Sequence, residues 1–588
     1  MLESTRKIDD AHPSQSSRLR LRLIVAILQA VALYLLTAAA QSPPSWPASE
    51  PVLFVPLFLI AMLVPLILMM GVGEISARAL ALWAGVATLI ILGVGYHDVA
   101  RGRFTNEGSA DAFWPWDRLW LALVPSLFIA HVLVVDAVKE RRLFPSYTRH
   151  FDTAWKLGVQ IVLAAVFLGV FWIVLQLGAA LFQLVYIASF GELLGRRWFA
   201  YPASALAVAV SLHVTDIRPQ LIRGGRAVIL ALFSWLLPVM VVILLGFFAS
   251  LPFVSLAQLW ATHDTASMML GMMGLLILFL NCWYGDVKAP GNRLMGIAGF
   301  LGALLLMPLA GLAAQALALR VAPYGWTPDR ISAAVLIGIA GFYAIGYVGA
   351  VVRRPFNPKF IERVNVAGAM LCLAAFLALF SPLADPARLM VANQVGRLKL
   401  GLVSPEKFDF GALRIDGARW GAASLAELVK TPEVAIASRA QRALMLRNTY
   451  DRWDTSPSPV QPLTERIEIY PDGRTLPARF YDHEFWLGSL HREPSCFREN
   501  ESKCVARYVA LHPGEADSIL FFDGYKAMIF EQDEKGTWQP TAHGINECTG
   551  DLRDGITAGS FHLEPPHWPN IAIGHGHILF RPLHADCP

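Results

Sequence analysis

The sequence predicts an α-helical polytopic membrane bundle of about eleven transmembrane helices, followed by a C-terminal extracytoplasmic domain that is mainly β. Hydrophobic residues make up 55% of the 588-residue chain, charged residues only 16%, and the mean hydropathy is +0.48. These values lie outside the range of ordinary soluble proteins. The two parts also differ in charge, because residues 1–383 hold 27 Lys/Arg and 18 Asp/Glu whereas residues 384–588 hold 22 and 27.

Residues 21–383 supply the bundle. A bilayer core about 30 Å thick requires roughly 20 apolar residues per helix, because unpaired backbone groups are costly in hydrocarbon. Apolar segments of this kind lie near residues 21–40, 51–70, 79–96, 119–138, 157–178, 199–214, 227–249, 266–284, 294–314, 331–350 and 364–383. Residues 1–20 form a basic N-terminus. The first segment also resembles a secretory signal peptide, but its apolar run is nearly long enough to cross the bilayer, which favours a retained helix.

The orientation follows from the distribution of basic residues. With a cytosolic N-terminus, the cytosolic connections and span ends carry 20 Lys/Arg and the opposite ones carry seven. The nearly unbroken apolar stretch 157–190 is long enough for two short spans, but two crossings would change this count to 15 against 12. We therefore expect one span there, followed by an interfacial or re-entrant segment ending at Glu192. Eleven crossings predict a bacterial inner (plasma) membrane protein with a cytoplasmic N-terminus and a periplasmic C-terminus.

The periplasmic part has three predicted segments. Residues 384–453 form a helical collar, in which Ser404, Pro405 and Glu406 are typical of a helix start. Residues 454–463, rich in Pro and Ser, form a linker. Residues 464–588 form a β domain, because "ERIEIY", "ARYVAL", "SILFF", "AMIFEQ" and "HILFRPL" are typical of strands and turn sequences separate them.

Four cysteines lie in this tail: Cys496, Cys504, Cys548 and Cys587. An even number of cysteines in an oxidising compartment predicts two disulfides, for which three connectivities are possible. We favour Cys496–Cys504, which closes a short loop, and Cys548–Cys587. A zinc site is the competing interpretation, but the tail has no C-x-x-C pair and its cysteine spacing fits zinc poorly.

The tract "VSPEKFDFGALRIDGARWGAASLAEL", after "RRPFNPKFIERVNVAGAML" and "NQVGRLKLG", resembles the bacterial inner-membrane family called domain of unknown function 4153. The resemblance runs from about residue 25 to near residue 430. It extends more loosely to "TERIEIYPDGRTLP", "CFRENESKCVARYV" and "FHLEPPHWPNIAI" in the tail. Some family tails have an acidic calcium-type loop after the second cysteine. This chain has His512, Pro513 and Gly514 there, so we expect no calcium site at this position. The family has no established activity, so the resemblance implies a location and no mechanism.

The same tract concentrates aromatic and charged side chains directly after the last span. One interpretation is a packed joint between the bundle and the tail, which we favour because aromatic stripes are usually packing. The other is an interfacial segment that binds lipid or a partner. The candidate residues are Phe408, Asp409, Phe410, Arg414, Arg419 and Trp420.

Polar residues are rare in the predicted spans, and most lie near span ends. His131 and His213 are the candidate intramembrane functional groups, and Asp136 and Asn281 lie near the ends of the fourth and eighth spans. Buried ionisable groups in membranes mark transport pathways, but hydrogen bonds between helices are the commoner use of such residues. A deep polar-lined pocket at His131 or His213 would favour a transporter or an enzyme, whereas a tightly packed bundle would favour a noncatalytic role.

Enzyme, metal and nucleic-acid signatures are weak. The sequence contains no G-x-S-x-G, H-E-x-x-H or phosphate-loop motif. Five histidines of the tail could in principle form a metal site: His562, His567, His575, His577 and His584. Solvated loop histidines are common, so we predict no metal and no cofactor. The acidic tail argues against nucleic acid. We expect a noncatalytic envelope accessory or sensor-like protein that contacts the lipid bilayer and a periplasmic protein or ligand. The alternatives are a transporter of a neutral or lipid-like cargo and a membrane-embedded enzyme at the outer interface.

Overall fold

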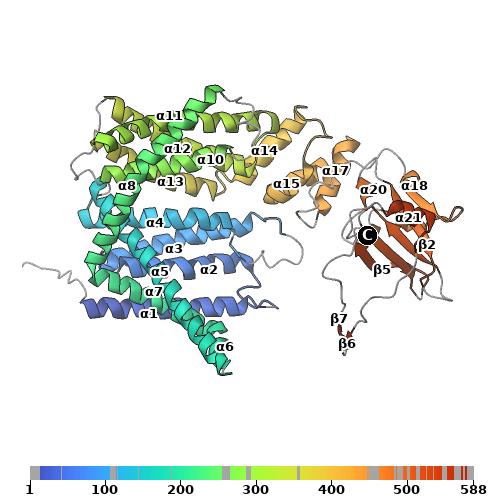
Figure 1. The fold of residues 1–588 in the computed structure, drawn as a ribbon, viewed down its shortest axis with the longest axis horizontal. Coiled ribbons are helices and arrows are strands. Elements are labelled where there is room, and N and C mark those ends of the chain that lie inside the picture. Colours follow the sequence, from blue (N-terminus) through green and yellow to red (C-terminus); the bar gives the residue numbers. More distant parts are fainter. Residues whose placement is uncertain are drawn as a thin grey trace, which may run out of the picture. The chain divides into compact units, whose positions relative to one another are not determined.

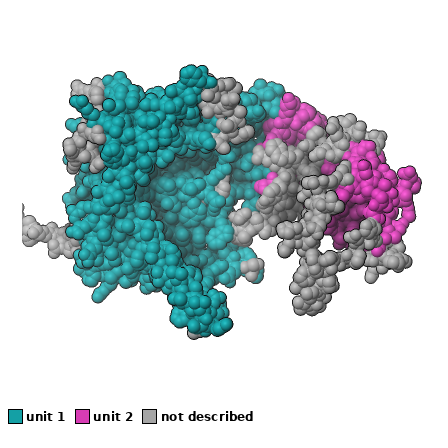
Figure 2. Space-filling model, in the orientation of Figure 1, with its two compact units in different colours: residues 1–403, 413–424 teal, residues 404–412, 425–588 magenta. Residues whose placement is uncertain are grey.

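A computed structural model describes the chain from residue 14 to residue 578 in two compact units (Figure 2). Residues outside the described part are 1–13, 42, 106–113, 116, 143–144, 187, 254–264, 286–292, 354–357, 447–448, 450–462, 483–484, 487–493, 499–502, 512–516, 525, 534, 546–551, 562–570, 574–575 and 579–588. The first unit comprises Met1–Val403 and Leu413–Ser424, and the second comprises Ser404–Ala412 and Leu425–Pro588. The predicted linker 454–463 therefore falls almost entirely outside the described residues.

Eleven helices of the described chain are long and apolar enough to cross a membrane, which confirms the predicted bundle. They are α1 (Gln15–Ala39), α2 (Pro51–Gly71), α3 (Ala77–Ala100), α4 (Asp117–Glu140), α5 (Tyr147–Leu184), α7 (Arg197–Ile217), α8 (Pro219–Ser250), α10 (Thr265–Gly285), α11 (Arg293–Tyr324), α12 (Pro328–Arg353) and α13 (Pro358–Leu379). Each predicted span has one helix at its position. Many of their Leu, Ile, Val and Phe side chains are exposed, as lipid-facing positions require.

Helix α5 decides the ambiguous stretch 157–190. It is one continuous helix of 38 residues, and the short helix α6 (Ser189–Gly195) follows it. At 1.5 Å per residue α5 is about 57 Å long, well beyond the hydrocarbon core, so it spans once and extends past it. The structure thus agrees with a single span and with an odd number of candidate crossings.

The bundle consists of two groups of helices, the first formed by α1 to α5 with α7 and the second by α8 and α10 to α13 (Figure 1). Each has a main hydrophobic core, and Phe376 of α13 also packs into the first one. In the first group, Phe54 and Leu59 of α2 pack with Ile91 of α3 and Leu123 of α4. The second group packs α8, α10, α11, α12 and α13 around residues that include Leu237, Met273, Leu306 and Ala344. Helices α4 and α5 contact α13, and α5 also contacts α8, so the boundary between the groups runs along these helices.

The chain after the bundle begins with four more helices, as expected for residues 384–453. They are α14 (Pro386–Lys399), α15 (Phe410–Asp416), α16 (Ala418–Leu428) and α17 (Val434–Met445). The helix start predicted at Ser404 is wrong. Ser404 instead opens a turn, in which its carbonyl accepts the Lys407 N–H at 3.0 Å, and the next helix begins at Phe410. The Asp409 carboxylate accepts the Ala412 N–H at 2.8 Å and so caps that helix.

The second unit contains the predicted β region. Its five-stranded sheet has the order β1 (Ile467–Tyr470), β2 (Cys504–Val509), β3 (Ser518–Phe522), β4 (Lys526–Gln532), β5 (Trp538–Ile545). Strand β1 runs parallel to β2 and the other neighbours are antiparallel. Strands β6 (Ile571–Ile573) and β7 (Gly576–Ile578) form a separate hairpin, and α18 (Leu463–Arg466), α20 (Ser495–Arg498) and α21 (Arg553–Ala558) are short helices.

An aromatic cluster fills one side of this sheet. Trp486 is fully buried, and its indole N–H donates to the Phe480 carbonyl at 2.9 Å. The Trp486 ring centroid lies 4.6 Å from that of Phe521 and 5.4 Å from that of Phe530. Aromatic side chains bury large areas, so this cluster gives the small β region its own core.

Candidate functional site

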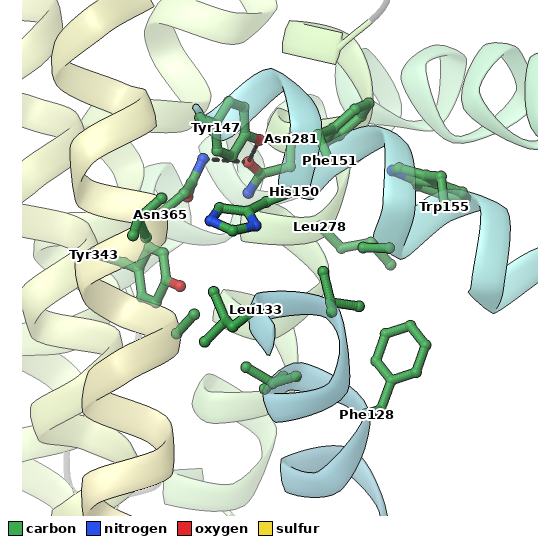
Figure 3. A pocket seen from close by; sticks show the side chains of 15 residues that line it. Phe128, Leu133, Tyr147, His150, Phe151, Trp155, Leu278, Asn281, Tyr343 and Asn365 are labelled. Carbon is green, nitrogen blue, oxygen red and sulfur yellow. Dashed lines mark hydrogen bonds between the residues drawn. The ribbon is translucent and has the colours of Figure 1, made fainter. Parts of the chain in front are cut away.

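A cavity of about 260 Å³ lies at the boundary between the two groups of helices. Helices α4 and α5 of the first group form one side of it, and α10, α12 and α13 of the second group form the other (Figure 3). The residues that line it are Phe128, Ile129, Val132, Leu133, Tyr147, His150, Phe151, Ala154, Trp155, Leu278, Asn281, Tyr343, Asn365, Val366 and Ala369. A cavity of this size holds many times the volume of one water molecule, so it is large enough for part of an organic ligand.

One end of the cavity is formed by a hydrogen-bonded set of neutral polar side chains. The Tyr147 hydroxyl donates to Asn281 Oδ1 at 3.0 Å, and the Asn365 amide donates to the same oxygen at 2.7 Å. The Asn281 amide donates to the Tyr347 hydroxyl at 2.7 Å, which donates to Asn365 Oδ1 at 2.7 Å. These four residues come from α5, α10, α12 and α13, so the set joins the two groups of helices through hydrogen bonds.

His150 stands beside this set and is held from behind by a buried carboxylate. Asp136 of α4 is completely buried, and its Oδ2 lies 2.8 Å from His150 Nδ1. The Thr153 hydroxyl donates to the other carboxylate oxygen at 2.7 Å. His150 Nε2 is buried and has no hydrogen-bond partner among the described residues. A carboxylate that fixes one imidazole nitrogen leaves the other nitrogen oriented for a ligand.

The remaining walls are apolar. Phe128, Leu133 and Trp155 lie around the rest of the cavity in Figure 3. Among the described lining residues there is no Lys, Arg, Asp or Glu. Apolar walls with a few convergent polar groups at one end are the usual form of a small-molecule site, and here they match an amphiphile.

The polar end of the cavity lies near one of the two membrane surfaces. Its residues come from the N-terminal ends of α5 and α13 and the C-terminal ends of α4, α10 and α12. Because successive spans cross in opposite directions, all these ends lie on the side at which α1 begins. The site therefore lies toward that leaflet.

The two histidines singled out from the sequence lie elsewhere. His131 Nδ1 accepts the Trp83 indole N–H at 3.0 Å, a contact between α3 and α4, and His131 does not line the cavity. His213 lies on α7, partly exposed, and does not line it either. No span pattern marks His150, because it lies ten residues after α4 ends and ahead of the predicted span 157–178. The polar residues Asp136 and Asn281 near span ends were the available signal.

In the aromatic tract after the bundle, Phe408 and Phe410 belong to the second unit and are buried. Their rings meet edge to face with centroids 4.7 Å apart. Buried rings of this kind are typical of packed side chains, and the joint between the bundle and the tail stays a prediction.

Arg414, Arg419 and Trp420 belong to the first unit, in a segment that packs on the end of α3. The Arg419 N–H donates to the Arg101 carbonyl at 2.8 Å, and the Arg414 guanidinium lies 5.1 Å from the Phe104 ring centroid. Trp420 is half-buried beneath the Arg419 guanidinium, at 4.7 Å. Gly421 allows α16 to approach the Leu413 carbonyl, since a Cβ there would lie 1.7 Å from that oxygen.

A second buried polar cluster lies at this same end of α3. Asp385, the N-cap of α14, is fully buried and lies 2.8 Å from His97 Nε2 and 3.5 Å from Arg101. Burial alone would raise the pKa of Asp385, but the hydrogen bond from His97, with Arg101, lowers it below its usual value. The cluster fastens α14 to the end of α3.

In the β region, Cys496 and Cys504 form a disulfide with Cα atoms 5.6 Å apart, as the short-loop pairing predicts. Cys548 and Cys587 lie outside the described residues, so the second pairing stays a prediction. His562, His567, His575 and His584 also lie outside them, and the His577 side chain is not described. Among the residues described, no group of three or more His, Cys, Asp or Glu side chains is arranged to hold a metal ion.

Comparison with known proteins returned no matching family model, no matching curated protein and no matching solved structure.

Proposed function

We propose that this chain is a bacterial inner-membrane transporter of a lipid-like cargo, and that the cavity between the two groups of helices binds that cargo. The observation that carries the proposal is the cavity itself, with apolar walls and one neutral polar end (Figure 3). A molecule with an apolar chain and a hydrogen-bonding head matches both parts. The absence of charged side chains among its described lining residues argues against an ionic cargo.

The position of the cavity also supports transport. Many transporters bind their substrate where two bundles meet and move one bundle against the other around that site. Here each group of helices has its own main core, while the hydrogen bond from Tyr147 of α5 to Asn281 of α10 crosses the boundary between the groups and the Asn281–Asn365 bond holds its polar end together. Breaking those bonds would open a route along the boundary.

We further propose that the N-terminus is cytoplasmic and the β region periplasmic. The excess of Lys/Arg on the side of the N-terminus supports this, and the Cys496–Cys504 disulfide fits an oxidising compartment. The cavity's polar end then faces the cytoplasmic leaflet. Membership of the family called domain of unknown function 4153 is part of the proposal and rests on the tract around residues 403–428.

A noncatalytic accessory or sensor-like role is the second candidate. Its support is that the β region forms a compact unit with its own aromatic core, separate from the bundle that would carry cargo. In that role the β region would bind a periplasmic protein or ligand. The two candidates differ in whether lipid crosses the membrane.

The test measures movement of a fluorescent diacylglycerol across proteoliposomes, scored by the fraction that a membrane-impermeant quencher reaches. Transport predicts faster exchange with the wild-type protein than in protein-free vesicles. Asn365→Val should change that rate, and Ser234→Ala should not, because the Ser234 hydroxyl only bonds the Leu230 carbonyl of its own helix. Wild-type exchange equal to that of empty vesicles would exclude this cargo class and leave the accessory role.

The topology has a separate test. A phosphatase reporter fused after the last residue should be active, and a fluorescent reporter that folds only in the cytoplasm should be dark at the same place. The opposite pair of results would place the β region in the cytoplasm.

A further inference from the structure

Nε2 of His150 is a buried nitrogen of the bundle to which the contacts described above assign no role. The residue is 7% exposed and lines the cavity, and Nε2 is buried with no hydrogen-bond partner among the described residues. Leaving a buried polar atom unpaired costs about 1–3 kcal/mol. Native interiors satisfy nearly all such atoms, so an exception that faces a cavity points to a ligand.

Asp136 determines what this atom can do. Its carboxylate can only accept hydrogen bonds, and it accepts one from the Thr153 hydroxyl at 2.7 Å and one from His150 Nδ1 at 2.8 Å. The proton of a neutral imidazole therefore lies on Nδ1, and Nε2, on a residue that lines the cavity, carries a lone pair without a partner among the described residues. Figure 3 shows the His150 ring between the Asn281–Asn365 pair and Leu133, at the junction of the polar and apolar walls.

The surrounding charges select the kind of headgroup. An anionic phosphate or carboxylate would enter beside buried Asp136 and would find no cation among the described lining residues. Arg226 lies 5.3 Å from the ring centroid of the lining residue Phe151, but its guanidinium is paired with Asp152 at 2.7 Å. Placing an anion here would leave a buried charge unpaired, which is costly. An uncharged donor avoids this cost.

Resting on the transport function proposed above, we infer that the cargo is a lipid whose headgroup presents a free, uncharged hydroxyl, and that this hydroxyl donates its hydrogen bond to Nε2 of His150. The Asn365 amide and the Tyr343 hydroxyl offer further bonds to the oxygens of such a head, whereas both N–H groups of Asn281 are already bonded to the Ile277 carbonyl and the Tyr347 hydroxyl (Figure 3). The apolar side chains of α4 and α5 take the start of the acyl or alkyl chain.

The experiment uses three matched photoreactive probes, a diazirine-bearing long-chain alcohol, its methyl ether and its phosphate monoester. Each is cross-linked to the full-length protein in detergent, and labelled peptides of α4 and α5 are quantified in competition with unlabelled compound. The alcohol should bind about 10-fold more tightly than the ether, which lacks the donor, and more tightly than the phosphate.

Variants separate the hydrogen bond from the shape of the cavity. In His150→Phe the alcohol and the ether should bind alike, because Nε2 is gone while an aromatic ring remains. In His150→Gln the side-chain amide oxygen can again accept, so part of the preference should return. Ser234→Ala serves as the control that keeps the wild-type ratio. If a His150 variant does not fold, the alcohol-to-ether ratio of the wild-type protein still decides.

The possible results have distinct meanings. Labelling of α4 and α5 with equal affinity for alcohol and ether would overturn the hydroxyl inference while the cavity remained a lipid site. Preference for the phosphate would overturn it as well. If no probe labels these helices, the cavity binds no such lipid, and the transport function fails together with the inference.

Discussion

Arg22 is the buried charge on which the N-terminal group of helices most depends. It lies within α1, inside the segment predicted to span, and is only 1% exposed. Its guanidinium donates to the Met69 carbonyl at 2.9 Å and to the Val72 and Leu212 carbonyls at 3.3 Å. It also forms an ion pair with Asp216 of α7. One side chain thus ties α1 to the end of α2 and to α7.

Replacing Arg22 by Met keeps the apolar stem and removes every one of these bonds. Removing one partner of a buried ion pair typically costs about 3–5 kcal/mol, because the other charge is left buried. Asp216 would retain Gln160, whose amide donates to it at 2.7 Å, and Lys156 at 4.0 Å. We therefore expect the lower end of the range, a loss of about 3 kcal/mol in the free energy of unfolding.

The assay is unfolding of the purified protein in mixed micelles by increasing mole fraction of dodecyl sulfate. Arg20→Met is the matched control, because Arg20 is exposed on the same helix, and its expected change is within about 0.5 kcal/mol. The double variant Arg22→Met/Asp216→Asn should be more stable than Arg22→Met alone, since the unpaired carboxylate is gone. The reasoning is refuted if Arg22→Met is as stable as Arg20→Met, or if the second substitution restores nothing.

Three further predictions follow from other contacts. Burial alone would raise the pKa of Glu74, but the charges of Lys156 and Lys139 outweigh burial and lower this pKa to about 2. The contribution of Glu74 to stability is therefore complete above about pH 4.5 and is lost as the pH falls toward 2. Glu74→Gln should flatten this part of the stability profile measured by thermal unfolding, and an unchanged slope would contradict the assignment. Asn281→Leu removes the hydrogen bond from Tyr147, which joins the two groups of helices, together with the bonds to Tyr347 and Asn365 within the second group, and should cost about 1 kcal/mol in the micelle assay, whereas wild-type stability would show that these bonds contribute nothing. Paired Cys496→Ser and Cys504→Ser substitutions open a loop with a sequence separation of 8 and should destabilise the β region by about 2–3 kcal/mol, seen as faster limited proteolysis of the full chain; equal cleavage rates would argue against it.

The number and positions of the spans are properties of local composition. Eleven apolar segments suffice to predict eleven helices, because each helix satisfies its own backbone hydrogen bonds wherever hydrocarbon surrounds it. The strands β1 to β4 were recognisable for a similar reason, since their side-chain patterns are local. Strand β5 was missed because "WQPTAHGI" contains a proline and a glycine and lacks an apolar run. The helix start near Ser404 was misplaced because the local signal of Ser-Pro-Glu also fits a turn.

The class of molecule, the candidate crossings and the location of the β region and its first disulfide therefore follow from local composition. The cavity could not be predicted, because Asp136, His150, Asn281 and Asn365 lie on four different helices and no local pattern indicates that these helices bring them together. Only the tertiary structure decided which polar residues face one another and which atom is left unpaired. The physical reason is that apolar periodicity specifies which residues leave water, whereas hydrogen-bond geometry between helices depends on how those helices pack.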